Sequence, residues 1–285
     1  MDYSGFQLRI ACLYSKDDTM LEIFKTHGDM HSVTAINVFC RNMSLEEFMK
    51  VKKEEPYKTY RFKSKGVGFG FLFGRSAYGF KPDLEENWTD EEIKKYIEDN
   101  NIKIDNDDLY LVVAEDIRNK FFETYKKLPV WINNQHNLAM KYGYVDSSFN
   151  GRRHLSLLHN INIDNIDRIE NDGYRNKYKK KINNLFNIAV NSPVQNFEAL
   201  TAYRDMRKIW DEMKKRNLKS RFIAMIHDSF SFYIHKDEIA DMYHICTEAM
   251  NDYDSYEIPI LCEFEIGKNW LDMKEVTKDN LWEFK

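Results

Sequence analysis

The chain has 285 residues, and its 42 Lys and Arg against 46 Asp and Glu give a formal net charge of −4. This length allows one large domain or two modest ones with a substantial core, and five prolines without a low-complexity run argue against disorder. No charge-free apolar stretch approaches the roughly 20 residues of a membrane span, and the N-terminal MDYSGFQLR lacks a signal-peptide layout, so we expect no membrane partner.

Cysteines and charge clusters bear on the cellular setting and on partners. The four cysteines form no C-x-x-C pair, which argues against a structural zinc site or a disulfide framework and fits a reducing cytoplasm. Acidic residues gather between positions 83 and 116, whereas basic residues gather at 50–65, 175–181 and 214–221. Because such segregation can place a basic surface on an acidic molecule, the net charge argues neither for nor against nucleic acid.

The first expected elements are helices. An apolar helical pattern runs over 8–24, and a second helix begins near Asp29. His31 lies in the first turn of that helix, where a helix N-terminus favours anions, although by itself it fits an ordinary surface histidine near a cap better. The sequence S-L-E-E from Ser44 has the spacing of a capping box and predicts a short helix through Lys53.

The most unusual stretch is 60–80, YRFKSKGVGFGFLFGRSAYGF. Its glycines are poor helix formers, and small and large residues alternate, so propensity alone allows a strand or a glycine loop. It is not a Walker loop, because no G-K-[ST] follows. Read at a spacing of four, however, it places on one helical face two cations, which suit phosphates, and two rings, which suit a base: Arg61, Lys65, Phe69 and Phe73.

An acidic segment over 83–108 follows, which we interpret as an insertion. The sequence T-D-E-E from Thr89 is another capping box and predicts a helix to about Asn100. An Asp/Asn-rich stretch at 105–108 suggests calcium, but it lacks the Gly and the closing Glu of an EF-hand loop.

The later elements are mostly helical, with strand signals near the C-terminus. They are helices over 108–128 and 129–142, a turn-rich crossing over 143–158, a helix over 172–217 interrupted at 191–193, a helix over 236–250 and a strand over 258–266. Within this part, RFIAMIHDSFSFYI at 221–234 predicts a β-hairpin with Asp228 at its tip. A carboxylate held rigidly at a turn suits a metal ion, but this stretch alone fits an ordinary surface hairpin better.

Three blocks of the sequence resemble, in order, the motifs of DNA polymerase family A, of the bacterial DNA polymerase I type. MDYSGFQLR resembles D-Y-S-Q-I-E-L-R, RFKSKGVGFGFLFGRSAYGF resembles R-x-x-x-K-x-x-x-F-G-x-x-Y-G, and IHDSF resembles V-H-D-E-x. The intervening GDMHSVTA, GYVDSSFNGRR, NSPVQN and EFEIGKNW also resemble segments of that family. The likeness is to the C-terminal part of such a polymerase and covers most of the chain apart from the acidic insertion.

The resemblance implies template-directed DNA synthesis, in which two Mg²⁺ ions assist nucleotidyl transfer from a dNTP to a primer 3′-hydroxyl. Asp2 and Asp228 would bind the ions, with the backbone carbonyl of Tyr3 as a further ligand. Arg61 and Lys65 would neutralise the triphosphate, and the glycine-rich stretch would be the fingers helix. The resemblance further assigns His31, Gln7, Phe69 and Phe73 to the nucleotide, and Asn191, Gln195, His227 and Arg152 to the DNA.

Several positions depart from the family's pattern. Gln7 replaces a Glu and Phe73 a Tyr whose side chains meet in the family, so the changes look coupled and leave neither charge nor hydroxyl. Ser229 replaces the Glu after the second metal aspartate, and Asn187 stands where Arg is common. In the family a strand, the thumb and usually a proofreading domain precede the first metal aspartate, so we expect Asp2 to lack a paired strand.

The sequence therefore predicts a mixed α+β fold, with an antiparallel palm sheet and helical fingers but without thumb and exonuclease domains. The expected domains are palm at 1–20 and 161–285, and fingers at 21–160. The expected partners are primer-template DNA, dNTPs and a separately encoded N-terminal half with thumb and exonuclease, in the cytoplasm of a bacterial host if the gene is a phage's. Two other interpretations stay open: a fragment of a single-subunit phage-type RNA polymerase, and a non-catalytic polymerase remnant.

Overall fold

The computed structural model describes residues 1–26, 28–40, 43–104, 108–161, 166 and 168–284, and these form two compact units. Unit 1 comprises Met1–Leu13, Asp146–Gly151 and Pro193–Lys285, and unit 2 comprises Tyr14–Val145 and Arg152–Ser192. Helices dominate and the sheets are small and antiparallel, so the predicted α+β class is confirmed. None of the helices in these described ranges combines the length and apolar character of a membrane span. Most of the Asp/Asn-rich stretch, 105–107, lies outside the described residues.

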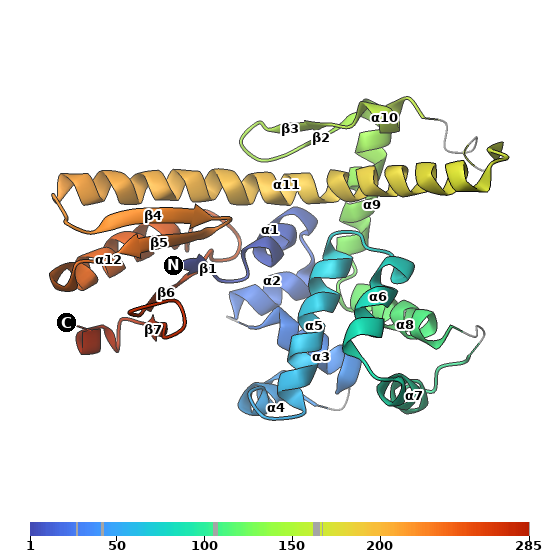
Figure 1. Cartoon of the computed structure of the whole chain (residues 1–285), viewed down its shortest axis with the longest axis horizontal. Helices are drawn as coiled ribbons and strands as arrows, with labels where there is room; N and C mark the ends of the chain where they lie inside the picture. The colour runs from blue at the N-terminus through green and yellow to red at the C-terminus, as the bar shows by residue number, and fades with distance from the viewer. Residues whose placement is uncertain (27, 41–42, 105–107, 162–165, 167, 285) are drawn as a thin grey trace. The chain divides into compact units, whose positions relative to one another are not determined.

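Unit 1 contains a three-stranded sheet and a hairpin. β1 (Asp2–Tyr3) pairs with β6 (Cys262–Ile266), whose other edge pairs with β7 (Lys274–Val276). β4 (Arg221–Ile226) and β5 (Ser229–Tyr233) form the hairpin, which lies along the C-terminal half of α11 (Asp172–Lys215) in Figure 1. The other elements are α1 (Phe6–Ser15), the 3-10 turns η2 (Lys236–Glu238) and η3 (Leu281–Phe284), and α12 (Ile239–Met250).

The hairpin is confirmed as predicted. His227 and Asp228 form its two-residue turn, between the paired residues Ile226 and Ser229. His227 has a φ of 56°, a left-handed conformation that suits a tight hairpin turn. The hydroxyl of Ser229 donates to the carbonyl of Ile226 at 3.1 Å, so this residue supports the turn. Asp228 therefore stands at the tip.

The expectation that Asp2 lacks a paired strand is wrong. Asp2 lies opposite Glu263, and Tyr3 lies opposite Cys262 in β6. Met1 also exchanges backbone hydrogen bonds with Phe230 of β5, at 3.2 Å from its amino group and 2.8 Å to its carbonyl. Residues 1–3 thus join the three-stranded sheet to the hairpin.

Unit 2 is a helical assembly. Its elements are α2 (Asp18–Lys25), α3 (Met30–Phe39), α4 (Leu45–Val51), α5 (Tyr57–Leu72), α6 (Ala77–Asn87), α7 (Asp90–Asp99), α8 (Leu109–Thr124), α9 (Leu128–Tyr142), α10 (Ser156–His159), the N-terminal half of α11, and the short strands β2 (Tyr144–Asp146) and β3 (Arg152–His154), of which Asp146 belongs to unit 1. The helix starts predicted at Asp29, Ser44 and Thr89 are confirmed, since each of these side chains caps its helix.

The glycine-rich stretch is helical and forms most of α5. Its buried residues, at positions 64, 67, 68, 71 and 72, recur at the spacing of one helical face. The ring of Phe71 lies 4.8 Å from that of Phe80 and 5.8 Å from that of Phe121. Burial of such aromatic side chains outweighs the low helix propensity of the glycines, about 1 kcal/mol each.

Two predicted helix boundaries are wrong. The helix expected over 8–24 breaks at Lys16, which has a φ of 52°, and α2 restarts with Asp17 as its cap. The interruption expected at 191–193 is absent, because α11 continues through Pro193. A proline in a helix costs about 3 kcal/mol, but Val190 and Val194 on either side are fully buried, and each buried side chain contributes roughly 1.5–3 kcal/mol.

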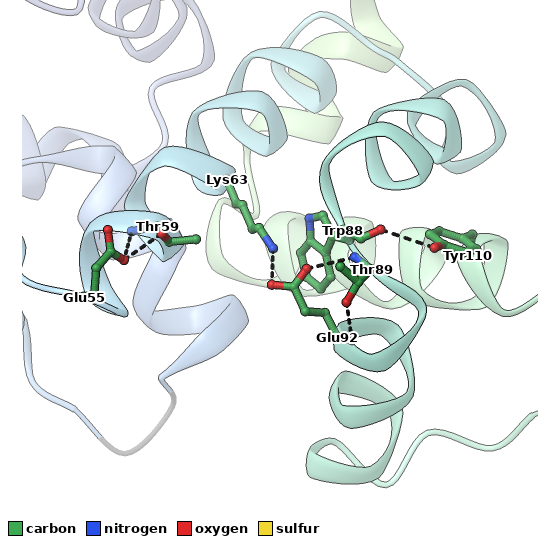
Figure 2. Close-up of polar contacts among 7 residues, drawn as sticks. All are labelled: Glu55, Thr59, Lys63, Trp88, Thr89, Glu92 and Tyr110. Atoms are coloured by element: carbon green, nitrogen blue, oxygen red, sulfur yellow. Dashed lines mark hydrogen bonds and ion pairs between the residues drawn. The ribbon is translucent and has the colours of Figure 1, made fainter.

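The acidic segment packs within unit 2 through two lysines, one buried and one partly buried. In Figure 2, Lys63 of α5 reaches Glu92 of α7, with Nζ and Oε1 2.7 Å apart, beside the ring of Trp88. From α8, Lys120, 5% exposed, donates to the hydroxyl of Tyr96 and to Asn100 Oδ1, both at 2.7 Å. Acidic and polar side chains of α7 are therefore bound by cations of the unit.

Candidate active site

Two carboxylates from opposite ends of the chain are neighbours in unit 1. Asp2 stands on β1 and Asp228 at the tip of the hairpin, and the Met1–Phe230 hydrogen bonds join these elements. Burial, followed by the charge of Asp228, raises the pKa of Asp2, and burial also raises the pKa of Asp228. The fold thus holds two carboxylates that repel each other, and a bound cation would relieve that repulsion.

The donor set suits a hard divalent cation. Mg²⁺ prefers oxygen ligands and is commonly held by one or two carboxylates, with water and substrate phosphates completing its shell. In the described ranges of the chain, no group of three or more His, Cys, Asp or Glu side chains is arranged to hold a metal ion by itself. Asp2 and Asp228 therefore fit a magnesium site that substrate completes, and the Tyr3 carbonyl stays a predicted further ligand.

Gln7 meets a third carboxylate that sequence reasoning missed. Its Nε2 donates to Glu198 Oε2 across 2.8 Å, from the first turn of α1 to α11. Burial, with a smaller contribution from the charge of Asp228, raises the pKa of Glu198, although the Gln7 amide opposes this. Although Gln7 itself is uncharged where the family has a Glu, Glu198 supplies a carboxylate beside it from another helix.

Tyr3 is anchored to the same helix. Its hydroxyl donates to Asp205 Oδ2 at 2.7 Å, and Asp205 Oδ1 also accepts from Arg204 Nε at 2.8 Å and Lys208 Nζ at 2.9 Å. Burial, followed by the charge of Asp205, raises the pKa of Tyr3, so the phenol remains a donor. The seven-residue spacing of Glu198 and Asp205 places both on one helix face, but acidic residues on helices are far more often solvated, and the sequence alone did not single them out.

In unit 2, charged side chains converge at the start of α3. Asp29 caps this helix by accepting from His31 N at 3.1 Å, and its other oxygen accepts from Arg61 Nε at 2.5 Å. Burial alone would raise the pKa of Asp29, but the bonds from Arg61 and Ser32 hold it below its usual value. Arg61 of α5 is thus fixed by an ion pair to α3, a contact that the sequence did not indicate.

His31 packs on the face of α5 that carries Phe69. Its ring centroid lies 5.7 Å from that of Phe69, and Lys65 precedes Phe69 by one turn. Burial, partly opposed by Asp29 and reinforced by the charges of Arg61 and Lys65, lowers the pKa of His31 to about 4. At neutral pH the imidazole is therefore uncharged and can offer a phosphate a hydrogen bond but no positive charge.

The remaining predicted residues occupy less distinctive positions, and their roles stay predictions. Phe73 is the C-cap residue of α5, and Arg152 is exposed in β3 with its guanidinium 3.9 Å from the centre of a tyrosine ring. Asn191 lies in the unit 2 part of α11, and Gln195 is exposed one turn later in the unit 1 part. His227 is exposed beside Asp228.

The sequence matches the family model of DNA polymerase family A over residues 1–272. The chain belongs to this family. Relatives among family A polymerases include DNA polymerase I of Caldicellulosiruptor bescii, 27% identical over 273 residues, and DNA polymerase I of Bacillus subtilis, 24% identical over 273 residues. The DNA polymerase of Bacillus phage SP01 is 26% identical over 292 residues.

These alignments cover 96% of the chain for the two bacterial enzymes and 99% for the phage enzyme, but only 26% and 27% of the relatives. The chain therefore spans about a quarter of the length of the curated relatives it matches. The fold is also similar to that of the POL domain of Pol1 from M. smegmatis, in a complex with DNA primer-template and dNTP. That likeness has a TM-score of 0.65 at 22% identity and covers 91% of this chain and 37% of the other.

Proposed function

We propose that this family A chain performs nucleotidyl transfer in template-directed DNA synthesis, with unit 1 as palm and unit 2 as fingers. The observation that carries the proposal is the neighbouring pair of carboxylates, Asp2 and Asp228, held by β1 and the hairpin. The substrate is a dNTP, and the acceptor is the 3′-hydroxyl of a primer on its template. Family membership supports this reaction.

The carboxylates of unit 1 serve the reacting end of the primer. Two Mg²⁺ ions, when bound, would activate the primer hydroxyl and neutralise charge on the phosphates. Asp2 and Asp228 would hold them, because burial raises the pKa of both carboxylates, the charge of Asp228 adds to this at Asp2, and a cation would relieve both effects. Gln7, in the first turn of α1, would face the sugar of the incoming nucleotide.

The cations and rings of unit 2 serve the incoming nucleotide. Arg61 and the exposed Lys65 supply positive charge for the triphosphate, and neutral His31 adds a hydrogen-bond donor. Because Asp29 already fixes Arg61, less side-chain entropy is lost when the phosphates bind. Phe69, 38% exposed, offers a face to the sugar and base, and Phe73 would lie at the nascent pair. The residues proposed to contact the DNA are Asn191, Gln195, His227 and Arg152.

We also propose a partner, the N-terminal half of a polymerase made as a separate polypeptide. A groove of about 490 Å³ opens beside Met1 in unit 1, lined by residues 230–234 of the hairpin and 264–267 at the end of β6. β1 covers only the first two residues of β6 along that edge, so an extended segment of the partner can add backbone hydrogen bonds there. Trp270 at the groove is 75% exposed and would be covered by the same partner.

Primer extension with purified protein tests the reaction. Asp2→Asn and Asp228→Asn should each abolish magnesium-dependent dNTP incorporation, whereas Glu248→Gln, an exposed residue of α12 in the same unit, should not. Near-normal incorporation by either Asn variant would remove the assignment. A preference for rNTPs would indicate the RNA polymerase interpretation, and DNA binding without incorporation by the wild type would indicate a non-catalytic remnant.

Co-expression with the product of the neighbouring upstream reading frame tests the partner. Alone, this chain of net charge −4 should bind duplex DNA weakly and tend to aggregate through its exposed apolar groove. With the partner, solubility and extension should both be restored. Robust templated synthesis by the isolated monomer would contradict the partner proposal but leave the reaction itself intact.

A further inference from the structure

The segment that carries Asp2 is short, and backbone hydrogen bonds join it to β6 and to the hairpin from Met1 to Ser4. β1 is two residues long, and the chain then turns at Gly5, which has a φ of 59°, to begin α1 at Phe6. Side chains from elsewhere in unit 1 add to these backbone bonds in fixing the position of Asp2.

Helix α11 supplies those side chains as a buried polar stripe. Glu198, Thr201 and Asp205, spaced by three and four residues, are 7%, 1% and 1% exposed. The two carboxylates bind the segment on either side of the Gly5 turn. Asp205 accepts from the Tyr3 hydroxyl at 2.7 Å, and Glu198 accepts from the Gln7 amide at 2.8 Å.

Apolar packing lies between these two hydrogen bonds. The rings of Tyr3 and Phe6 stack with centroids 4.1 Å apart, and Phe6 meets Phe197 of α11 edge-on at 6.3 Å. The turn is therefore held by one bond at each end and by rings in the middle. Rotation of the segment would have to break all of these contacts together.

Glu198 is costly to the fold, which argues that it is kept for function. Arg204 and Lys208 compensate the charge of Asp205, but no ion pair reaches Glu198 within the ranges that the structure describes. A buried carboxylate that is bonded to a neutral amide costs stability. Buried groups that reduce stability in this way are concentrated at functional sites, and the charges of Asp228 and Asp2, the candidate metal ligands, act on Glu198.

We propose that Glu198 and Asp205 are positioning residues, which through Gln7 and Tyr3 hold the Asp2 carboxylate in the geometry for metal binding. This proposal rests on the proposed function in one respect, that Asp2 and Asp228 bind the metal. Outer residues that orient metal ligands typically change metal affinity by about 10–100-fold. Glu198 and Asp205 should act in this range without touching the ion.

The test measures Mn²⁺ binding to the full chain by electron paramagnetic resonance, without DNA or nucleotide. Gln7→Met and Tyr3→Phe each remove one hydrogen bond without changing charge, and each should weaken Mn²⁺ binding about 10-fold or more. The double variant with Gln7→Glu and Glu198→Gln keeps both the net charge and an amide–carboxylate hydrogen bond. It should therefore bind Mn²⁺ with the affinity of the wild type. Asp211→Asn, an exposed α11 carboxylate paired with Arg207, is the matched control and should bind normally.

The outcomes separate this proposal from the metal assignment. Melting curves in EDTA ensure that Mn²⁺ affinities are compared among folded proteins. If one of the two single variants misfolds, the other still tests the proposal, because it changes a different residue. Unchanged affinity in Gln7→Met and Tyr3→Phe, with binding lost in Asp228→Asn, would overturn the positioning role alone. Failure of the exchanged pair to recover affinity would overturn the role of the Glu198 bond. Normal Mn²⁺ binding by Asp228→Asn would overturn the metal site and the positioning role together.

Discussion

Asp228→Asn should raise the free energy of unfolding of the metal-free chain, although it should abolish nucleotide incorporation. Burial raises the pKa of Asp2, Asp228 and Glu198, and the charge of Asp228 adds to this rise at the other two. A raised pKa means that folding disfavours the ionised form, so each charge costs stability at neutral pH. Asparagine keeps the shape of the side chain but removes one of the three charges.

The expected gain is modest because solvent screens the site. One pKa unit corresponds to about 1.36 kcal/mol, but solvent still reaches more than a third of Asp2 and part of Asp228, which weakens the effect of burial, so we expect about 0.5–1 kcal/mol. The sign also fixes the pH dependence. As the pH falls through the raised folded pKa values, the wild type takes up protons and regains stability. The free energy of unfolding of the wild type therefore lies furthest below that of the variant at neutral pH. The difference vanishes below pH 3.8, the ordinary pKa of Asp.

Urea unfolding followed by circular dichroism, in EDTA, measures this difference. The gain should shrink at high salt, because the repulsion is screened, and added Mg²⁺ should stabilise the wild type but not the variant. Asp211→Asn on α11 is the control, since it loses a favourable exposed contact with Arg207 and should gain nothing. If Asp228→Asn proved less stable than the wild type at neutral pH in EDTA, the carboxylate would be a structural residue and the reasoning would be refuted.

Two further predictions concern sugar selection and the acidic segment. Gln7→Ala should increase ribonucleotide incorporation, because Gln7 nearly fills the volume of Glu and would block a 2′-hydroxyl; an unchanged ratio of rNTP to dNTP incorporation in primer extension would place the gate elsewhere. Lys120→Met should lower the free energy of unfolding by about 2–4 kcal/mol, because it leaves the buried Tyr96 hydroxyl and the partly buried Asn100 and Asp116 without the Lys120 ammonium. Exposed Lys94→Met in α7 is its control, and a loss below about 1 kcal/mol in Lys120→Met would show that the segment is held otherwise.

Short-range signals were sufficient for the hairpin turn and for three of the helix starts. Caps at Asp29, Ser44 and Thr89 join groups two or three residues apart, and the hairpin at Asp228 depends on residues adjacent in sequence. Both partners of such a contact lie within the few residues that a sequence pattern covers, so the prediction and the structure agree there.

Propensity was misleading where packing competes with it. Glycines in α5 and Pro193 in α11 each disfavour a helix locally, yet both helices continue because residues beside them are buried. For α5 the helical period was present at the buried positions Val67 and Phe71, whereas nothing near Pro193 in sequence reveals which residues will cover it.

For the candidate site, the family motifs indicated the residues but not their partners. Asp2, Gln7 and Arg61 stand in motifs, whereas Asp205, Glu198 and Asp29 contact them from other elements. A contact between residues far apart in sequence depends on the packed fold, and no single motif records it. The structure therefore adds the groups that orient the site rather than those that define it.

Under the proposed function, each of the two candidate sites has a charge that one part of the substrate complex would balance. Unit 1 presents Asp2, Asp228 and Glu198 with raised pKa values, which is negative charge that the fold leaves unrelieved. Unit 2 presents Arg61 and Lys65, whose positive charges help to keep His31 neutral. A nucleoside triphosphate with its Mg²⁺ carries both complementary signs, anionic phosphates for unit 2 and cations for unit 1. Under the proposed function, both sites keep an electrostatic cost because the substrate complex, rather than the protein alone, completes their charge balance.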